Sequence, residues 1–367
     1  MVVNMYKSES GKAGIIILVI LAVILIICIG GFMWYTSSLK AVQSNNNEKL
    51  EVIIDEGAGT AGIAKKLESA GVIRNANAFK IYCKLNKKTS LKAGKYEFTK
   101  NMSVHDIVDR LTNGAIVDDS VTITFIEGKN IMTVAKTIAN NTNNAEEDVY
   151  NLLKDEDYID SLIKEYWFIT DDIKNKDIYY SLEGYLYPDT YTFENKDVKV
   201  EEIFKIMLDA MDSQLSQYKS EINKSDYSVH ELLTMASIVE LEAVKESDRA
   251  TVAGVFYNRI NKGMALQSDV TTYYGLKKEM SSGDLTATEL AKKNPYNTRA
   301  NNMAGKLPVG PICMPSSNAI KAAIEPEKSN YIFFVADKNG DVHYSKTNSE
   351  HEALIKELKE KGLWYTY

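Results

Sequence analysis

One uncharged apolar segment limits how this chain can be arranged more than any other feature. Residues 15–35 carry no charged side chain, and they end in Trp34 and Tyr35. Their number matches the roughly 20 residues that a helix needs to cross a bilayer, and Trp and Tyr are typical of the membrane–water interface. A cleaved signal peptide is the alternative, but its apolar part is usually only about 7–15 residues long, and no clear small-x-small cleavage site follows. We therefore predict an uncleaved transmembrane helix over residues 15–35.

The flanks of this segment suggest an orientation. A short cytoplasmic tail is expected over residues 1–14. The large remainder is expected on the external face of the cell membrane, because long C-terminal parts are translocated largely regardless of charge. A polar linker, containing the run Ser-Asn-Asn-Asn-Glu, is predicted over residues 36–49.

Composition excludes several classes of protein. Of the 367 residues, 45% are hydrophobic and 25% are charged, which is typical of a folded protein with two or three domains. A net charge of −7 argues against a nucleic-acid partner. The 3 cysteines form no disulfide framework or Cys-x-x-Cys pair, and the 4 histidines are scattered. Phosphate-binding, Gly-x-Ser-x-Gly and His-Glu-x-x-His motifs are missing from the sequence. We expect no cofactor and no metal.

An internal repeat follows the linker. Residues 52–57 and 63–67 match residues 123–128 and 134–138 at one constant offset, and each pair is typical of a strand, a Glu-Gly turn and an amphipathic helix. We interpret the two copies as packing units without a catalytic constellation. The predicted organisation is a first unit over 50–116, a second unit with a helical insertion over 117–182, and a mixed α+β domain over 183–367.

Glu240 is the most informative polar residue of the last domain. Ser228 and Glu231 have capping-box spacing and predict a helix that contains it. At about 100° per residue, Glu240 shares a stripe with three small or apolar residues, Leu233, Ala236 and Ser237. Partial desolvation would help this carboxyl group to keep its proton, as the cleavage of a glycosidic bond requires. From the local pattern alone, a solvated surface glutamate is the commoner interpretation.

Glu242 looks like a partner for Glu240, but helix geometry separates them. Two residues correspond to a rotation of about 200°, so the two side chains cannot serve the same bond. Glu242 is then either a carboxylate that orients the substrate or one member of a buried ion pair. Asp269 could still approach from elsewhere. This geometry favours a mechanism with a single acid and base.

Two further segments have compositions suited to a glycan cleft. Residues 267–275 combine amide, hydroxyl and carboxylate groups with two tyrosines, which suits sugars, although a serine-capped helix with packing tyrosines fits as well. Residues 307–315 contain three prolines, so they predict a stiff loop that either borders a cleft or only connects elements. At the C-terminus, Asn339-Gly340 predicts a hairpin, and Thr347 with Glu350 predicts a capped helix.

Several spaced motifs, taken in order, resemble those of the YceG-like endolytic murein transglycosylases (MltG). The matching blocks are Glu183–Tyr191, Ala236–Glu240, Val255–Arg259, Leu266–Asp269, Pro295–Thr298, Leu307–Ile312, Thr347 and Glu350–His351. The resemblance implies an α+β fold with one N-terminal transmembrane helix, LysM-like units and a catalytic domain. Two positions depart from the family pattern. Leu241 stands where many relatives have a lysine, and Arg299 stands where an aromatic residue is common.

The resemblance also implies an activity. The family cleaves the β-1,4 bond between N-acetylmuramic acid and N-acetylglucosamine in nascent peptidoglycan and leaves a 1,6-anhydro end. Glu240 would protonate the glycosidic oxygen and then take the proton of the C6 hydroxyl. Cell-wall synthases are the expected protein partners. A hydrolytic muramidase and a non-catalytic glycan-binding scaffold remain the alternatives. The residues expected to bind the glycan are Tyr185, Tyr187, Glu242, Gln267, Ser268, Asp269, Thr271, Tyr296, Asn297 and Thr298.

Overall fold

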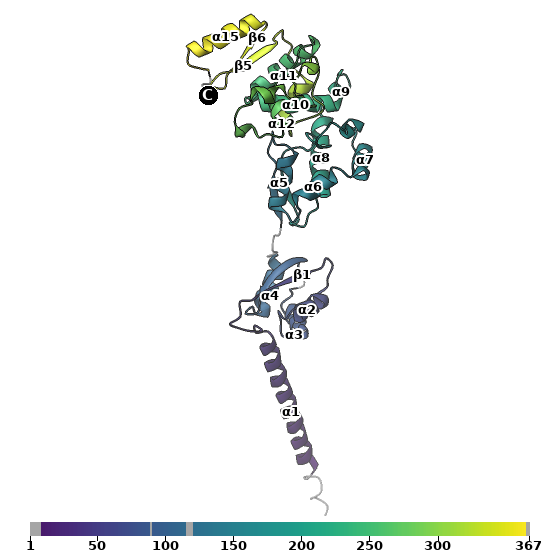
Figure 1. Cartoon of the computed structure of the whole chain (residues 1–367). Coiled ribbons are helices and arrows are strands. Elements are labelled where there is room, and N and C mark those ends of the chain that lie inside the picture. Colours follow the sequence, from purple (N-terminus) through teal and green to yellow (C-terminus); the bar gives the residue numbers. More distant parts are fainter. Residues whose placement is uncertain (1–8, 89, 115–119, 365–367) are drawn as a thin grey trace, which may run out of the picture. The chain divides into compact units, whose positions relative to one another are not determined.

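The computed structural model describes residues 9–88, 90–114 and 120–364, and the chain divides into two compact units, Met1–Asp118 and Asp119–Tyr367 (Figure 1). The units are described separately. The fold class is α+β, as predicted, and the described strands form three two-stranded antiparallel sheets.

The first unit begins with the long apolar helix α1, Glu9–Ser38. Within it, Ile15–Ser38 has a mean hydropathy of 3.5 in its most apolar window, and none of that window is buried. The helix is therefore long and apolar enough to cross a membrane, although a signal sequence has the same properties. The segment predicted as a linker starts as helix, because α1 continues to Ser38, whose hydroxyl donates to the Trp34 carbonyl.

A small α/β module completes the first unit. Its elements are β1 Lys49–Ile54, α2 Thr60–Ser69, α3 Ala76–Leu85, β2 Gly94–Thr99 and α4 Val104–Asn113. The two strands pair antiparallel, with Val52 opposite Tyr96. Alternate side chains of both strands are buried against the three helices, as the two-residue period of a strand requires.

The second unit opens with the second copy of the repeat. Its elements are β3 Val121–Thr124, α5 Ile131–Asn141, α6 Glu146–Leu152, α7 Glu156–Glu165, the 3-10 helix η1 Asp171–Lys174 and β4 Thr190–Phe193. The predicted strand, turn and helix are confirmed in both copies, and Gly57 and Gly128 adopt positive φ angles of 75° and 71° in the two turns. β3 pairs with β4, which lies beyond the predicted division at 182/183, and one core spans both sides of that position.

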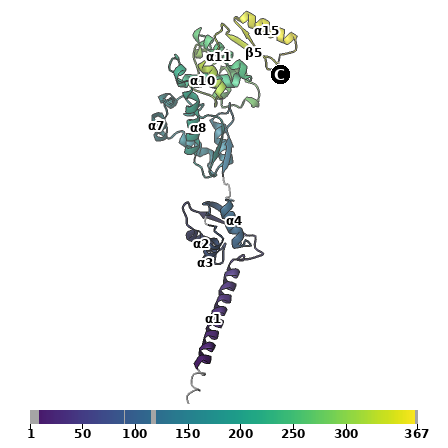
Figure 2. The ribbon, with the colours of Figure 1, turned by 180° about the vertical axis from the view of Figure 1, so that it is seen from behind.

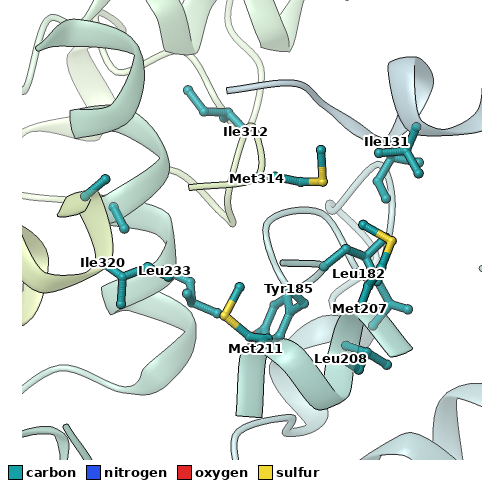
Figure 3. Close-up of a cluster of buried hydrophobic side chains, with 14 of the residues drawn as sticks. Ile131, Leu182, Tyr185, Met207, Leu208, Met211, Leu233, Ile312, Met314 and Ile320 are labelled. Atoms are coloured by element: carbon teal, nitrogen blue, oxygen red, sulfur yellow. The ribbon is translucent and has the colours of Figure 1, made fainter. Parts of the chain in front are cut away.

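Helices dominate the rest of this unit. They are α8 Val200–Ser216, α9 Lys219–Ile222, α10 Val229–Glu242, α11 Glu246–Asn261, α12 Asp269–Gly275, η2 Met280–Ser282, α13 Ala287–Ala291, η3 Asn301–Met303 and α14 Ser317–Ile324. α10 packs against α11 and α14, and residues 232–239 are all buried. A helix that is apolar on all sides belongs in a core. Figure 3 shows this core, in which Leu233 and Ile320 lie near Met211 and Tyr185.

The predicted helix start and C-terminal hairpin are both confirmed. The Ser228 hydroxyl accepts from the Glu231 backbone NH, and the Glu231 carboxylate accepts from the Ser228 backbone NH. At the C-terminal end, β5 Phe333–Ala336 pairs with β6 Val342–Ser345, and α15 Asn348–Glu360 packs on the pair. These last elements lie together in both views of the ribbon (Figure 1, Figure 2).

Candidate active site

Glu240 occupies the last turn of α10, and its side chain is only 7% exposed. One carboxylate oxygen, Oε1, accepts from Arg249 Nη2 at 2.9 Å. The other oxygen, Oε2, accepts from the Ser316 backbone NH at 2.9 Å and from the Ser316 hydroxyl. The predicted desolvation of Glu240 is therefore present. A guanidinium group, a backbone NH and a hydroxyl thus hold both oxygens of this buried carboxyl group.

Arg249 and Ser316 are the two site residues that the sequence did not predict. Arg249 lies in α11 with a side chain that is 8% exposed, and its Nη1 also donates to the Ser316 hydroxyl. Ser316 follows Pro315 and caps α14 by accepting from the Ala319 backbone NH. A serine followed by a helix-forming segment is a recognisable N-cap signal, but nothing local in the sequence links it to Glu240.

The Glu-Gly turn of the second repeat lies directly on the end of α10. Gly128 donates its backbone NH to the Met314 carbonyl at 2.8 Å, and Met314 donates to the Lys129 carbonyl at 2.9 Å. A Cβ placed on Gly128 would lie 3.3 Å from Leu241 Cδ2 and 3.8 Å from Glu240 Cγ. The proline-rich loop thus holds this turn against Glu240.

Glu242 and Asp269 belong to a second acidic group. The Ser268 hydroxyl donates to Glu242 Oε1, and Asp269 forms an ion pair with Arg299. Burial raises the pKa of Glu242, and Asp269 raises it further, whereas the hydrogen bond from Ser268 and the charge of Arg299 act in the opposite direction. Glu240 and Glu242 therefore belong to separate side-chain groups in this structure.

Three of the predicted glycan-binding residues, Tyr187, Gln267 and Asp269, remain accessible. Gln267 is exposed, and its φ of 57° is rare for a residue with a side chain. Arg259 Nη2 holds it by donating to Oε1 at 2.9 Å. Tyr187 is partly buried, and burial is the main cause that raises the pKa of its hydroxyl.

The other predicted contacts are not available to a glycan in this structure. Ser268 is 3% exposed and faces Glu242. Five further side chains are 0% exposed, namely Tyr185, Thr271, Tyr296, Asn297 and Thr298. The Tyr185 hydroxyl bonds to His230 Nδ1 at 2.8 Å, and the hydroxyls of Thr271 and Thr298 are 2.8 Å apart. In this structure these side chains are packed inside the unit and hydrogen-bond to other protein groups, so their surfaces are not exposed to a ligand.

Glu183 is a fully buried carboxyl group that joins three elements. Tyr274 donates to it at 2.8 Å, and the Ile131 backbone NH, at the start of α5, donates to both oxygens at 3.1 Å. Burial raises the pKa of Glu183 from 4.5 to about 8, although these hydrogen bonds act in the opposite direction. Glu183 therefore holds a proton in the folded protein at neutral pH.

This raised pKa predicts a pH-dependent stability. Because the folded state binds the proton more tightly, the free energy of unfolding should fall as pH rises from 4.5 to about 8 and level off above that. The expected fall is on the order of 3–5 kcal/mol, and Glu183→Gln should remove it. Chemical denaturation at several pH values gives the free energy of unfolding of the unaltered protein and of the Glu183→Gln variant. If the free energy of unfolding depends on pH equally in both proteins, the raised pKa does not belong to Glu183.

Among the described residues, no group of three or more His, Cys, Asp or Glu side chains is arranged to hold a metal ion.

Comparison with known proteins places the chain in a family. Residues 52–357 match the YceG-like family, and the chain belongs to that family. It is 37% identical over 323 residues to the endolytic murein transglycosylase of Bacillus subtilis (strain 168), covering 88% of this chain and 88% of that protein. It is 33% identical to the endolytic murein transglycosylase of Streptococcus pneumoniae serotype 2 (strain D39 / NCTC 7466), covering 89% of this chain but 61% of that longer protein.

A solved structure agrees with this assignment. The crystal structure of a putative YceG-like protein from Listeria monocytogenes is similar, with a TM-score of 0.60 and 40% sequence identity. The match covers 84% of this chain and 99% of the Listeria chain. The resemblance predicted from the ordered motifs is therefore confirmed at the level of the family.

Proposed function

We propose that this protein is an endolytic peptidoglycan lytic transglycosylase. It cleaves the β-1,4 bond between N-acetylmuramic acid and N-acetylglucosamine and leaves a 1,6-anhydro-muramoyl end. The observation that carries the proposal is Glu240, a carboxylate fixed by Arg249 and Ser316 at the end of a buried helix. Membership of a family with relatives named endolytic murein transglycosylases supports the same substrate.

In the proposed reaction the substrate supplies the nucleophile, which is its muramoyl C6 hydroxyl. Glu240 first gives its proton to the glycosidic oxygen, which keeps the electron pair of the breaking bond to the anomeric carbon. The resulting carboxylate then takes the proton of the muramoyl C6 hydroxyl as the C6 oxygen forms the new bond to the anomeric carbon. Arg249 and Ser316 hold both carboxylate oxygens, so the orientation of Glu240 is set before substrate binds. The accessible side chains of Tyr187, Gln267 and Asp269 are proposed to contact the glycan, and Glu242 is proposed to orient it.

The proposal extends to the location of the enzyme. α1 anchors the chain in the cell membrane, with the α/β module and the second unit on the external face, where they reach nascent glycan strands. The order of strand, two helices and strand in residues 49–99 supports a LysM-like module at the level of fold. Cell-wall synthases are the proposed partners, because newly made strands must reach Glu240 as they emerge.

Product analysis tests the activity. The full-length protein in detergent is incubated with purified, uncross-linked glycan strands, and the products are separated and weighed by mass spectrometry. The proposal predicts internal cleavage and fragments whose muramoyl ends are one water lighter than hydrolysis products. Products of the hydrolytic mass would indicate a muramidase, and bound but uncut strands would indicate a glycan-binding scaffold.

A further inference from the structure

A stripe on the outside of α3 combines apolar and basic side chains. Ile81 and Leu85 lie one turn apart on the helix and are 42% and 69% exposed. Lys80 and Lys84 border this pair, and Lys87 lies just beyond the end of the helix. The three lysines line one pocket of the first unit. We call these five residues the α3 face.

The positive charges of the α3 face have no acidic partners on the protein. In the described part of the chain, no carboxylate lies within ion-pair distance of the three lysines, whereas the neighbouring Lys88 pairs with Asp109 at 3.5 Å. The surrounding module is also basic. Residues 39–114 contain 13 lysine and arginine residues against 8 acidic ones, a net charge of +5, although the whole chain carries −7. Such a module is suited to a negatively charged surface.

Hydrogen bonds and packing hold this module directly on the end of α1. Leu39, the residue after α1, packs against the core of the module, and its carbonyl accepts from the Val104 backbone NH at 3.0 Å. The Arg74 guanidinium group donates to the Ala41 carbonyl through Nε at 2.9 Å and through Nη2 at 2.6 Å. The module therefore starts where the apolar helix ends.

α3 lies close to the end of α1 that carries the aromatic pair Trp34 and Tyr35. Burial is the main cause that raises the pKa of Tyr82 in α3, and Asp109 and then Tyr35 raise it further, so Tyr35 lies near Tyr82. Trp and Tyr at the end of a membrane-crossing helix are typical of the headgroup level. If α1 crosses a bilayer, α3 is therefore placed at the membrane–water interface.

We propose that the α3 face docks on the membrane in which α1 is anchored and binds anionic lipid headgroups there. Ile81 and Leu85 enter the boundary between headgroups and acyl chains, as the apolar side of an interfacial helix does. The ammonium groups of the three lysines contact lipid phosphates, while their aliphatic stems lie on apolar surface. This inference rests on the proposed membrane anchoring and is independent of the bond that the enzyme cleaves.

Amine footprinting of the full-length protein tests this contact. The protein is reconstituted into nanodiscs of phosphatidylcholine alone or of an equal mixture with phosphatidylglycerol, acetylated briefly and analysed by mass spectrometry. One lysine at an anionic surface contributes roughly fivefold in affinity, so three favour the docked state on the order of 100-fold. Lys80, Lys84 and Lys87 should therefore react at least about 10-fold more slowly in the mixed discs than in the neutral discs.

Another exposed lysine of the same module provides an internal control. The Lys92 ammonium group donates to the Asn113 carbonyl at 3.4 Å, at the C-terminal end of α4. The opposite end of α4 contacts Leu39, and ten helical residues separate the two ends by about 15 Å, which exceeds the Debye length. Lys92 should therefore react at rates that agree within about twofold in the two kinds of disc.

A double substitution separates docking from the effect of surface potential alone. Ile81→Ser combined with Leu85→Ser keeps all three lysines and removes the apolar contact with lipid. Because both positions are exposed, the module should stay folded. The protection of the three lysines in mixed discs should fall at least about fivefold in this variant.

Three outcomes would overturn the proposal. They are equal reaction rates of the three lysines in neutral and mixed discs, protection of Lys92 as strong as theirs, or protection that is unchanged in the double variant. Failure of the membrane anchoring would be seen earlier, as protein that elutes apart from the discs, and it would remove the inference as well. Loss of glycan cleavage would leave the footprint unchanged.

Discussion

Replacing Glu240 by glutamine is expected to abolish glycan cleavage while the protein stays folded. Glutamine keeps an oxygen that can accept from Arg249 and the Ser316 backbone, but it cannot take the proton of the C6 hydroxyl. Loss of a positioned base costs about 100- to 10,000-fold in rate. Release of anhydro ends over time, measured with the full-length protein and purified strands, provides the rate.

An exposed glutamate of the same unit provides the control for that experiment. Glu221 in α9 is accessible to solvent, and Glu221→Gln makes the same chemical change away from the site. It should cleave at the rate of the unaltered protein. A Glu240→Gln variant as active as the Glu221→Gln variant would show that Glu240 is not the base.

Removing Arg249 is expected to cause the largest loss of stability among single substitutions at the site. Arg249→Met leaves the Glu240 carboxylate buried and without its cation, since the two side chains are 8% and 7% exposed. Breaking a buried pair by removing one partner typically costs about 3–5 kcal/mol in the free energy of unfolding. Denaturant unfolding of the full-length protein in detergent, followed by near-ultraviolet circular dichroism, measures the change.

A double substitution identifies the cause of that loss. If the unpaired charge is responsible, Arg249→Met combined with Glu240→Gln should be more stable than Arg249→Met alone. If the double variant is as unstable as the sum of the two single variants, packing around the arginine side chain would explain the loss instead. A change below about 1 kcal/mol for Arg249→Met would mean that the pair is not buried in solution.

Local signals in the sequence were sufficient for much of the fold. The capping box of Ser228 and Glu231 marks the start of α10, and Asn339-Gly340 marks the hairpin between β5 and β6. Both are short-range features in which a few side chains satisfy nearby backbone groups. The constant offset between the repeats also located equivalent strands, turns and helices, because each copy uses the same local pattern.

The electrostatic partners of Glu240 could not be predicted in this way. Ser316 approaches from a loop far along the chain, and Arg249 reaches back from the next helix. Position 241 holds a leucine and no lysine, and the cation that pairs with Glu240 is Arg249. Leu241 instead packs on the core and on the Gly128 turn.

The sequence also could not show which aromatic and hydroxyl side chains are buried. Tyr185 and Tyr296 were expected to contact sugar because they occur in polar, family-like segments. In the structure both are 0% exposed, and Tyr185 bonds to a buried histidine. A tyrosine that stacks on a ligand and one that packs in a core have the same local sequence pattern, since only tertiary packing decides which surface it faces.

The most direct test of the account is the source of the oxygen at the new chain end. The central claim is that the muramoyl C6 hydroxyl, and not water, attacks the anomeric carbon. Full-length protein is incubated with glycan strands in water enriched in oxygen-18, and the products are weighed by mass spectrometry. The account predicts anhydro ends that carry no heavy oxygen. Muramoyl ends that incorporate one heavy oxygen per cleavage would contradict it and establish hydrolysis.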